Sequence, residues 1–206
     1  AARPRCYADA DQGVMTTAIH LRACASPLGA MTIAARTGPG APNGGELIGV
    51  WFDGQTHDRA GLPDDAAVEP GREGEPSVLA AARTWLERYF AGEDPGAPPP
   101  LAPAATAFQQ RVREQLLAIP RGSTRTYGQL ARRIAALTGR RGSARAVGGA
   151  VGRNPISIMV PCHRVVGADG AVVGYAGGTD RKIRLLRLEG ADLPGPDLAQ
   201  DGIPGL

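Results

Sequence analysis

The sequence predicts an α/β (α+β) protein in which an N-terminal β-sheet domain precedes a C-terminal helical domain with a helix-turn-helix. Short apolar runs alternate with turn residues in the first part of the chain, and amphipathic helical patterns follow a proline-rich stretch. With 206 residues, the chain is long enough to bury a core in two small domains. The expected boundaries are 1–15 for an N-terminal extension, 16–92 for the first domain, 93–103 for a linker, 104–190 for the second domain and 191–206 for a C-terminal tail.

Three short apolar runs predict the sheet. AIHLRACA (18–25) and AMTIAA (30–35) flank the turn sequence SPLG, which is typical of a β-hairpin, and ELIGVWFD (46–53) follows a loop rich in glycine and proline. A helix is expected next, over 77–90. Its apolar residues share one face: Leu79, Ala82, Leu86, Tyr89 and Phe90. The first domain is therefore expected to be a small antiparallel sheet with one helix.

The second domain is expected to begin with a helix that Thr106 caps and that Pro120 and Gly122 end. Its buried face is expected to consist of apolar residues at helical spacing: Phe108, Val112, Leu116 and Ile119. A second helix is predicted over 127–137, and a third follows the cap residue Ser143. Two helices joined by a short, glycine-containing loop are typical of a helix-turn-helix.

The third helix has an unusual composition, with Ala144 and Ala146 near its start and Gly148 followed directly by Gly149. A glycine within a helix costs about 1 kcal/mol relative to alanine, so two in succession need a reason. Two explanations are open. The helix packs closely against a neighbouring helix, or it approaches a nucleic-acid backbone, with Arg145 as the one long side chain that projects from it. Asn154-Pro155 then lead into an expected strand over 156–160.

Charge is distributed unevenly along the chain. The formal net charge is +3 and the pI is about 9.0, and arginines dominate 111–187 whereas acidic residues dominate 53–94. The arginine bias is also typical of a GC-rich genome, but its position favours an anionic partner for the C-terminal part, with nucleic acid as the leading class. The sequence has no apolar run long enough for a membrane span and no apolar region typical of a secretory signal.

The chain has three cysteines, Cys6, Cys24 and Cys162. An odd number without close spacing does not predict a disulfide framework and suits a reducing cytosol, so a cytoplasmic location is expected. Because no CxxC or HxxxH pairing occurs, no metal site is expected either.

Cys162 stands in the run VPCHRVVG, which is otherwise almost purely apolar. A lone cysteine is commonly a small buried hydrophobe. Here Pro161 is expected to end a strand at the cysteine, and His163 and Arg164 are expected to favour the nucleophilic thiolate. Glu189 in RLLRLEG is a candidate for the group that orients the imidazole in a Cys-His-acid relay. The pattern therefore favours a catalytic cysteine.

The sequence from Asn154-Pro155 through VPCHRVVG, GAVVGYAGG and RKIRLLRLEG resembles the active-site signature of the O6-alkylguanine-DNA alkyltransferases, also called methylated-DNA–protein-cysteine methyltransferases. FQQRVREQLLAIPRGSTRTYGQLA and ARAVGGAVGRNP resemble the helix-turn-helix of that family, in the same order. The resemblance is close over 104–190 and loose over 16–92. It implies a ribonuclease H-like N-terminal domain and a winged-helix-like C-terminal domain.

The resemblance also implies a function, namely DNA repair by direct damage reversal. The protein would bind double-stranded DNA that contains O6-alkylguanine, flip the damaged base and transfer its alkyl group once and irreversibly to its own cysteine. O4-alkylthymine would be a further substrate. No cofactor and no metal would be needed, and the protein would be monomeric, with cooperative assembly on DNA left open.

Five catalytic roles follow from the resemblance. Cys162 would accept the alkyl group, and His163 would take the thiol proton through a water molecule while Glu189 orients the imidazole. Asn154 would brace the turn that carries the cysteine. Tyr127 would donate a hydrogen bond to N3 of the guanine and so help to neutralise the departing base.

Contacts with DNA and with the base follow in the same way. Arg145 would fill the gap left by the flipped nucleotide, and Tyr175 would cover the base. The amide of Ala176 would donate to O6, and carbonyls near Cys162 and Val165 would receive the exocyclic amine. The remaining expected binding residues lie on the third helix or in the pocket: Ser143, Ala144, Gly148, Met159 and Ser157.

Three positions depart from the pattern of the family. Ala176 stands where many relatives carry serine, and Ser157 stands where some carry proline. Arg113 stands where many relatives carry a tryptophan after the valine, and the sequence does not indicate what replaces the packing of that ring.

Two other functions compete with alkyl transfer. A cysteine hydrolase or transferase acting on small acyl substrates would also use Cys162 and His163, but such enzymes normally place the two residues far apart in sequence and need an oxyanion hole. A non-catalytic alkylated-DNA-binding or regulatory protein would not need the cysteine. Retention of Cys162 within PCHR argues against it.

Overall fold

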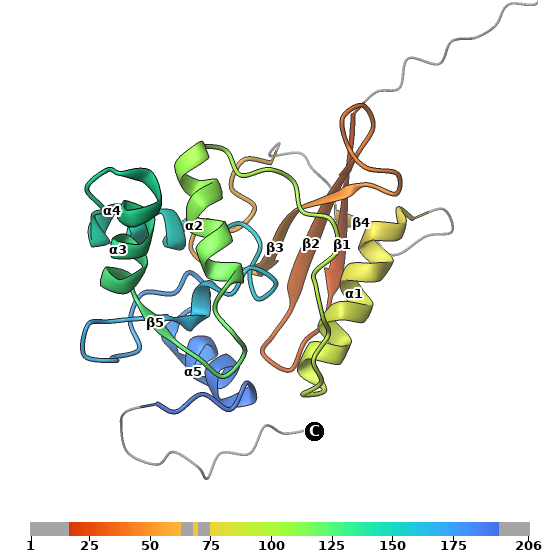
Figure 1. Ribbon diagram of the computed structural model, residues 1–206. Helices are drawn as coiled ribbons and strands as arrows, with labels where there is room; N and C mark the ends of the chain where they lie inside the picture. The colour runs from red at the N-terminus through yellow and green to blue at the C-terminus, as the bar shows by residue number, and fades with distance from the viewer. Residues whose placement is uncertain (1–16, 63–67, 70–74, 194–206) are drawn as a thin grey trace, which may run out of the picture.

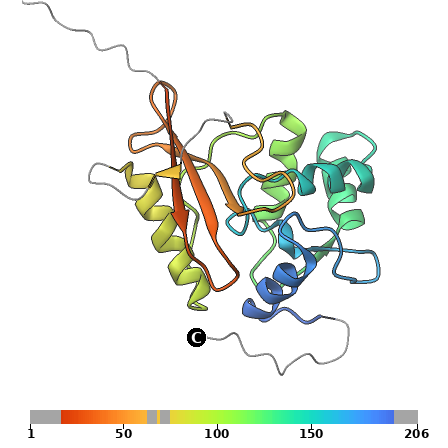
Figure 2. The same ribbon diagram turned by 180° about the vertical axis from the view of Figure 1, so that it is seen from behind.

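The computed structural model describes residues 17–62, 68–69 and 75–193. A β-sheet with helix α1 forms one half of the molecule, and helices α2 to α5 form the other half (Figures 1 and 2). The two halves share one continuous apolar core, in which Val50 of the sheet, Val112 of the helical half and Ile156 are all buried. The expected N-terminal extension and most of the expected C-terminal tail lie outside the described residues.

The sheet has the strand order β3-β2-β1-β4, in which β2 (Met31–Thr37) is antiparallel to both β1 (Ala18–Cys24) and β3 (Glu46–Phe52). This confirms the predicted hairpin, whose turn is fixed by a hydrogen bond of 2.6 Å from the Ser26 hydroxyl to the Gly29 carbonyl. A short strand that the sequence did not indicate, β4 (Val68–Glu69), pairs parallel with β1.

Helix α1 (Ser77–Phe90) covers one face of the sheet. All five residues that were expected on its buried face are buried, together with Val78. The helical spacing of these side chains directs them to one stripe, and their removal from water stabilises the contact with the sheet.

The proline-rich segment 93–103 is held against the edge of the sheet. The amide of Leu47 in β3 donates to the Pro100 carbonyl at 2.8 Å, and the amide of Ala102 donates to the Leu47 carbonyl, also at 2.8 Å. Arg121 of the helical half donates to the Glu93 carbonyl at 2.7 Å. The expected linker is therefore a fixed strap that runs along β3.

Helices α2 (Ala107–Leu117), α3 (Tyr127–Thr138), α4 (Ala144–Gly152) and α5 (Thr179–Leu188) form the second half, with β5 (Arg125–Thr126) pairing parallel to β6 (Val165–Val166). The predicted caps are confirmed: Thr106 accepts from the Gln109 amide at 3.1 Å and Ser143 from the Ala146 amide at 3.3 Å. Helices α3 and α4 form the predicted helix-turn-helix. None of the helices in the described ranges is long and apolar enough to cross a membrane.

The prediction for Phe108 was wrong. Val112, Leu116 and Ile119 are buried as expected, but the Phe108 side chain is 38% exposed. The helix begins at Ala107, so Phe108 lies in its first turn, and the buried positions of α2 begin with Val112, one turn later.

The prediction of a strand over 156–160 was also wrong. The segment forms a tight turn, in which only Ile156 bridges to Val50 of β3 and Ile158 has a left-handed φ of 69°. The side chain of Asn154 donates to the carbonyls of Ile156 and Val160, both at 3.0 Å. These bonds draw the segment into a loop that an extended strand would not allow.

The substitution Leu116→Ala should lower the free energy of unfolding by about 2–5 kcal/mol, because it leaves a cavity between α2 and the core. Urea denaturation measures the change. Leu137→Ala in α3 is the matched control, since this leucine is 67% exposed and its truncation should change stability by less than about 0.5 kcal/mol. Equal losses in the two variants would contradict the packing described here.

Candidate active site

Cys162 lies directly after the turn 154–160 and begins the short 3-10 helix η1 (Cys162–Arg164). Its side chain is buried, and its sulfur accepts a hydrogen bond of 3.1 Å from Nδ2 of Asn154. The same Nδ2 group donates to two carbonyls of the turn. Asn154 therefore fixes the position of the sulfur and the shape of the turn together, as expected for a bracing residue.

Burial raises the pKa of the Cys162 thiol, whereas the hydrogen bond from Asn154 and the positive charge of Lys182 lower it. Lys182, in α5, is fully buried and donates through Nζ to the carbonyls of Val165 and Val173. Burial lowers the pKa of Lys182 to about 8, and negative charge on Cys162 opposes that shift. Sequence reasoning missed this lysine, although it is the only lysine in the chain.

Arg164 does not contact the sulfur, which corrects the expectation that it favours the thiolate directly. Its guanidinium donates to the two carboxylate oxygens of Glu189 at 2.7 and 2.8 Å and to the Ile119 carbonyl at 2.6 Å. The role of Arg164 is therefore to hold Glu189, which lies at the end of α5.

His163 and Glu189 form the expected pair, with Nε2 of the imidazole 2.9 Å from Oε1 of the carboxylate. Burial alone would raise the pKa of Glu189, but the hydrogen bonds from His163 and Arg164 hold it well below its usual range. Burial lowers the pKa of His163, against the opposing effect of Glu189. The imidazole is thus neutral near pH 7.

The tautomer of His163 follows from its partners. An ionised carboxylate only accepts hydrogen bonds, so Nε2 carries the proton and Nδ1 keeps a free lone pair. Nδ1 is buried and has no hydrogen-bond partner among the described residues. This nitrogen is therefore available as a base.

Tyr89 also contacts Glu189, its hydroxyl donating to Oε1 at 2.7 Å. Because Tyr89 belongs to α1, the sheet half of the molecule reaches the site directly. Sequence reasoning placed Tyr89 only in the core, and nothing in the helical pattern distinguishes a core tyrosine from one that binds a carboxylate 100 residues away.

Two tyrosines lie near the sulfur. Tyr127 is the first residue of α3, and its hydroxyl donates to the Gly174 carbonyl at 3.2 Å. The ring of Tyr175 meets that of His163 edge-to-face, with centroids 6.5 Å apart. Burial raises the pKa of both phenols, and negative charge on Cys162 raises each further. Both therefore stay protonated and can act as hydrogen-bond donors.

A loop of the sheet half forms part of the surroundings of Cys162. The Thr56 amide donates to the Ala176 carbonyl at 3.0 Å, and Oε1 of Gln55 accepts from the Phe52 amide at 3.0 Å and from the Ser157 hydroxyl at 3.4 Å. The Ala176 amide has no partner among the described residues and is available to a ligand. The sequence analysis assigned no role to Gln55 or Thr56. Gln55 ends the run LIGVWFDGQ (47–55), which resembles the family only loosely, and Thr56 follows it.

The other expected pocket residues are close to Cys162 in the chain and deeply buried: Met159 at 3%, Ser157 at 1% and Val165 at 0% exposure. The carbonyls of Cys162 and Val165 each accept a hydrogen bond already, from the Val165 amide and from Lys182 respectively. A carbonyl oxygen has two lone pairs, so each can accept a second donor.

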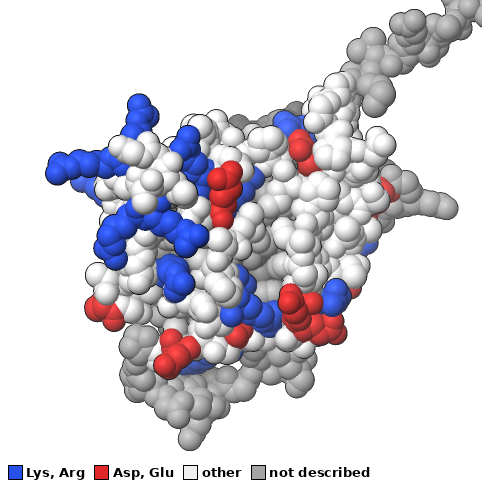
Figure 3. Space-filling model, viewed as in Figure 1, with Lys and Arg blue, Asp and Glu red and all other residues white. Residues whose placement is uncertain are grey.

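Close packing does not explain the two glycines of α4. A Cβ at Gly148 would be 3.8 Å from the Tyr127 ring, an ordinary contact distance, and Gly149 is exposed, so both positions have room for a side chain. The approach to a nucleic-acid backbone stays a prediction. Ser143, Ala144 and Arg145 are exposed. The surface over α3 and α4 gathers basic side chains (Figure 3). Exposed arginines of these helices and their loop are Arg132, Arg133, Arg140, Arg141 and Arg145.

Among the described residues, no group of three or more His, Cys, Asp or Glu side chains is placed to hold a metal ion. The groups that the structure brings together at the site are Cys162, the His163–Glu189 pair and the donors around them. This arrangement can generate a thiolate in a buried, basic environment and supply protons from the two phenols.

Known proteins share this sequence and fold. A family model described as "6-O-methylguanine DNA methyltransferase, DNA binding domain" matches residues 107–191. A methylated-DNA–protein-cysteine methyltransferase of Mycobacterium leprae is 42% identical over 174 residues, which cover 83% of this chain and 92% of the relative. The crystal structure of Mycobacterium tuberculosis OGT in complex with DNA matches with a TM-score of 0.65 at 42% identity, over 83% of this chain and 92% of that one.

The burial of His163 predicts a dependence of stability on pH. Because its pKa is lower in the folded chain than the value of about 6.5 in the unfolded chain, the unfolded state takes up a proton first as pH falls. The free energy of unfolding should therefore decrease from about pH 6.5 toward pH 5, as urea denaturation measures. In His163→Gln the free energy of unfolding should change less with pH over this window. In the control His57→Gln, at an exposed position, it should change with pH as in the parent. An unchanged slope in His163→Gln would assign the titration to another group.

Proposed function

Because the chain belongs to the methylated-DNA–protein-cysteine methyltransferase family, we propose that Cys162 is the cysteine that receives the methyl group. The protein is a DNA-repair enzyme that transfers the methyl group of O6-methylguanine in DNA to a cysteine. Cys162 is the one cysteine within residues 107–191, the part that matches the family model. The observation that carries the proposal is the contact of its sulfur with Asn154, beside the buried His163–Glu189 pair.

The reaction begins with loss of the thiol proton. The free lone pair on Nδ1 of His163 takes this proton through a water molecule, and Glu189 stabilises the imidazolium that results. Asn154 and the positive charge of Lys182 stabilise the thiolate. The sulfur then attacks the methyl carbon, so that an S–C bond forms as the C–O6 bond breaks, and the guanine leaves as an anion. The Tyr127 hydroxyl donates to N3 of the guanine and so helps to neutralise this anion.

The substrate base has to leave the duplex to react. Cys162 is only 4% exposed on a turn that Asn154 holds, so the sulfur cannot move to an atom inside the base stack. Exposed Arg145 fills the gap in the stack, and the small residues of α4 allow this helix to enter a narrow groove. Tyr175 covers the flipped base and the free amide of Ala176 binds O6. The same geometry serves O4-alkylthymine, whose alkyl carbon is also on an exocyclic oxygen.

The product is a thioether, which has no leaving group that would restore the thiol. Each molecule therefore reacts once. The protein acts as a monomer, in a compartment such as the cytoplasm where the thiol stays reduced. A non-catalytic DNA-binding role would not require the groups that stabilise the Cys162 thiolate and accept its proton.

Stoichiometry tests the role of Cys162. With limiting protein and a duplex that carries one labelled O6-methylguanine, label should move to the protein up to one equivalent and then stop. Cys162→Ala should bind the duplex but take up no label, whereas Cys24→Ala should react like the parent. Continued release of the methyl group with turnover would indicate a hydrolytic enzyme, and transfer to Cys162→Ala would place the acceptor elsewhere.

The role of Arg145 is tested by comparing two substrates. Arg145→Ala should slow transfer from the duplex by about 10- to 100-fold, because the cost of holding a flipped nucleotide out of the stack is a few kcal/mol. Its rate with free O6-benzylguanine should not change, since no base has to be flipped. Exposed Arg184→Ala in α5 is the control. A parallel loss with both substrates would mean that Arg145 acts on the pocket and not on the DNA.

A further inference from the structure

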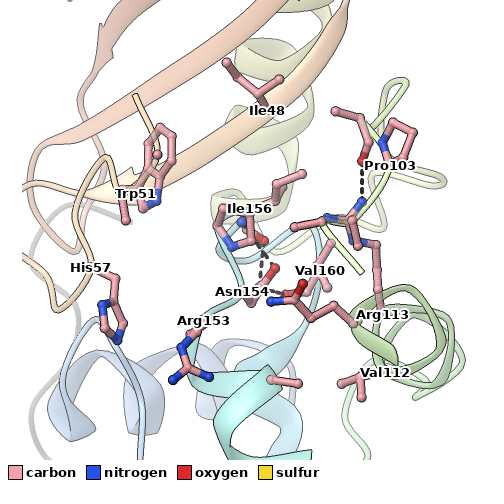
Figure 4. A pocket seen from close by; sticks show the side chains of 18 of the residues that line it. Ile48, Trp51, His57, Pro103, Val112, Arg113, Arg153, Asn154, Ile156 and Val160 are labelled. Carbon is pink, nitrogen blue, oxygen red and sulfur yellow. Dashed lines mark hydrogen bonds between the residues drawn. The ribbon is translucent and has the colours of Figure 1, made fainter. Parts of the chain in front are cut away.

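A cavity of about 580 Å³ lies behind the turn that carries Cys162 (Figure 4). It is open to solvent on one side and is bordered by the face of the sheet that is turned away from α1, by the strap, by α2 and by the turn. Its main wall residues, one or two from each element, are Ile48, Trp51, Ala102, Arg113, Ile156 and Val160. Its volume is in the range of small-molecule sites.

Arg113 brings a positive charge to this cavity. Its side chain is only 8% exposed, and within the described ranges its guanidinium makes a single hydrogen bond, to the Ala102 carbonyl. Burial lowers the pKa of Arg113, and no carboxylate within the described ranges opposes that effect. Most N–H donors of the guanidinium therefore lack a protein acceptor, although a buried charge without a counter-charge is unfavourable.

The charges around the cavity favour an anion. Among the described residues that line it, none is Asp or Glu, whereas Arg36 and Arg153 join Arg113 in the lining. Arg36 is already paired with Glu46, and Arg153 is exposed. Of these three arginines, Arg113 is therefore the buried one, and it has no carboxylate partner in the described part of the chain. The remaining wall is largely apolar and includes the indole of Trp51. A ligand that matches both features has an anionic head and an apolar body.

The guanidinium of Arg113 is suited to an anionic ligand. It lines the cavity and presents a planar, forked set of donors. Such a fork matches the two oxygens of a carboxylate.

We propose that this cavity is a binding site for an organic carboxylate with an apolar body. The carboxylate accepts two hydrogen bonds from Arg113, and the apolar part packs between Trp51, Ile48 and Val160. Asn154 lines the cavity, whereas Cys162 is not among its lining residues, so the bound molecule lies beside the residue that braces the turn and not at the alkyl-accepting sulfur. The proposal does not depend on the roles proposed above.

Titration calorimetry with octanoate as the probe tests the proposal, with octan-1-ol and octylamine as neutral and cationic analogues. Octanoate should bind with one equivalent, and octan-1-ol should bind about tenfold or more weakly, as expected for the loss of a buried charge-assisted hydrogen bond. Arg113→Met should remove the preference for octanoate, and Arg113→Trp should abolish binding of both. Stoichiometric methyl transfer by the two variants verifies that they fold.

Three outcomes would overturn the proposal. Equal affinities for octanoate and octan-1-ol would mean that the cavity is merely apolar. Unchanged octanoate binding by Arg113→Met would place the anion elsewhere on the protein. Absence of binding by any probe would mean that the cavity holds only water.

Discussion

The buried carboxylate of Glu189 is the interaction on which the site depends. It accepts hydrogen bonds from Tyr89 of α1 and from His163 and Arg164 of η1, and it lies itself at the end of α5. A buried negative charge is tolerated only when it is paired and its lone pairs are satisfied. Three separate elements must therefore be in place before the imidazole is held in one tautomer. The fold and the proton relay are for this reason parts of the same network.

The sheet half does more than support the helical half. Gln55 contacts Ser157, Thr56 contacts the Ala176 loop and the Arg181 guanidinium lies over the Phe52 ring at 4.6 Å from its centroid. These contacts hold the turn before Cys162 and the Ala176 loop from outside the helix-turn-helix. The positions of both segments accordingly depend on the two halves together.

Local signals in the sequence predicted much of this arrangement. The helical spacing of Leu79, Ala82 and Leu86 gave the extent of α1, and the side chains of Thr106 and Ser143 set helix starts, because caps and periodicity act over a few residues. The His163–Glu189 pair was predicted from chemistry and resemblance. The turn after Asn154, the charge of Lys182 near the sulfur and the contacts of Tyr89 and Gln55 were not predicted. They depend on bonds between segments distant in sequence, which no local pattern encodes.

The strap along β3 has a consequence for how copies of the protein meet. An open strand edge offers unpaired amides and carbonyls to which a strand of another chain can add, and this is a common route to aggregation. In this protein the Leu47 amide and carbonyl are taken by the strap. Pro98, Pro99, Pro100 and Pro103 have no amide hydrogen of their own to continue the ladder outward. The sheet therefore ends at the strap, and copies of the protein that meet at this edge find no template there for edge-to-edge association.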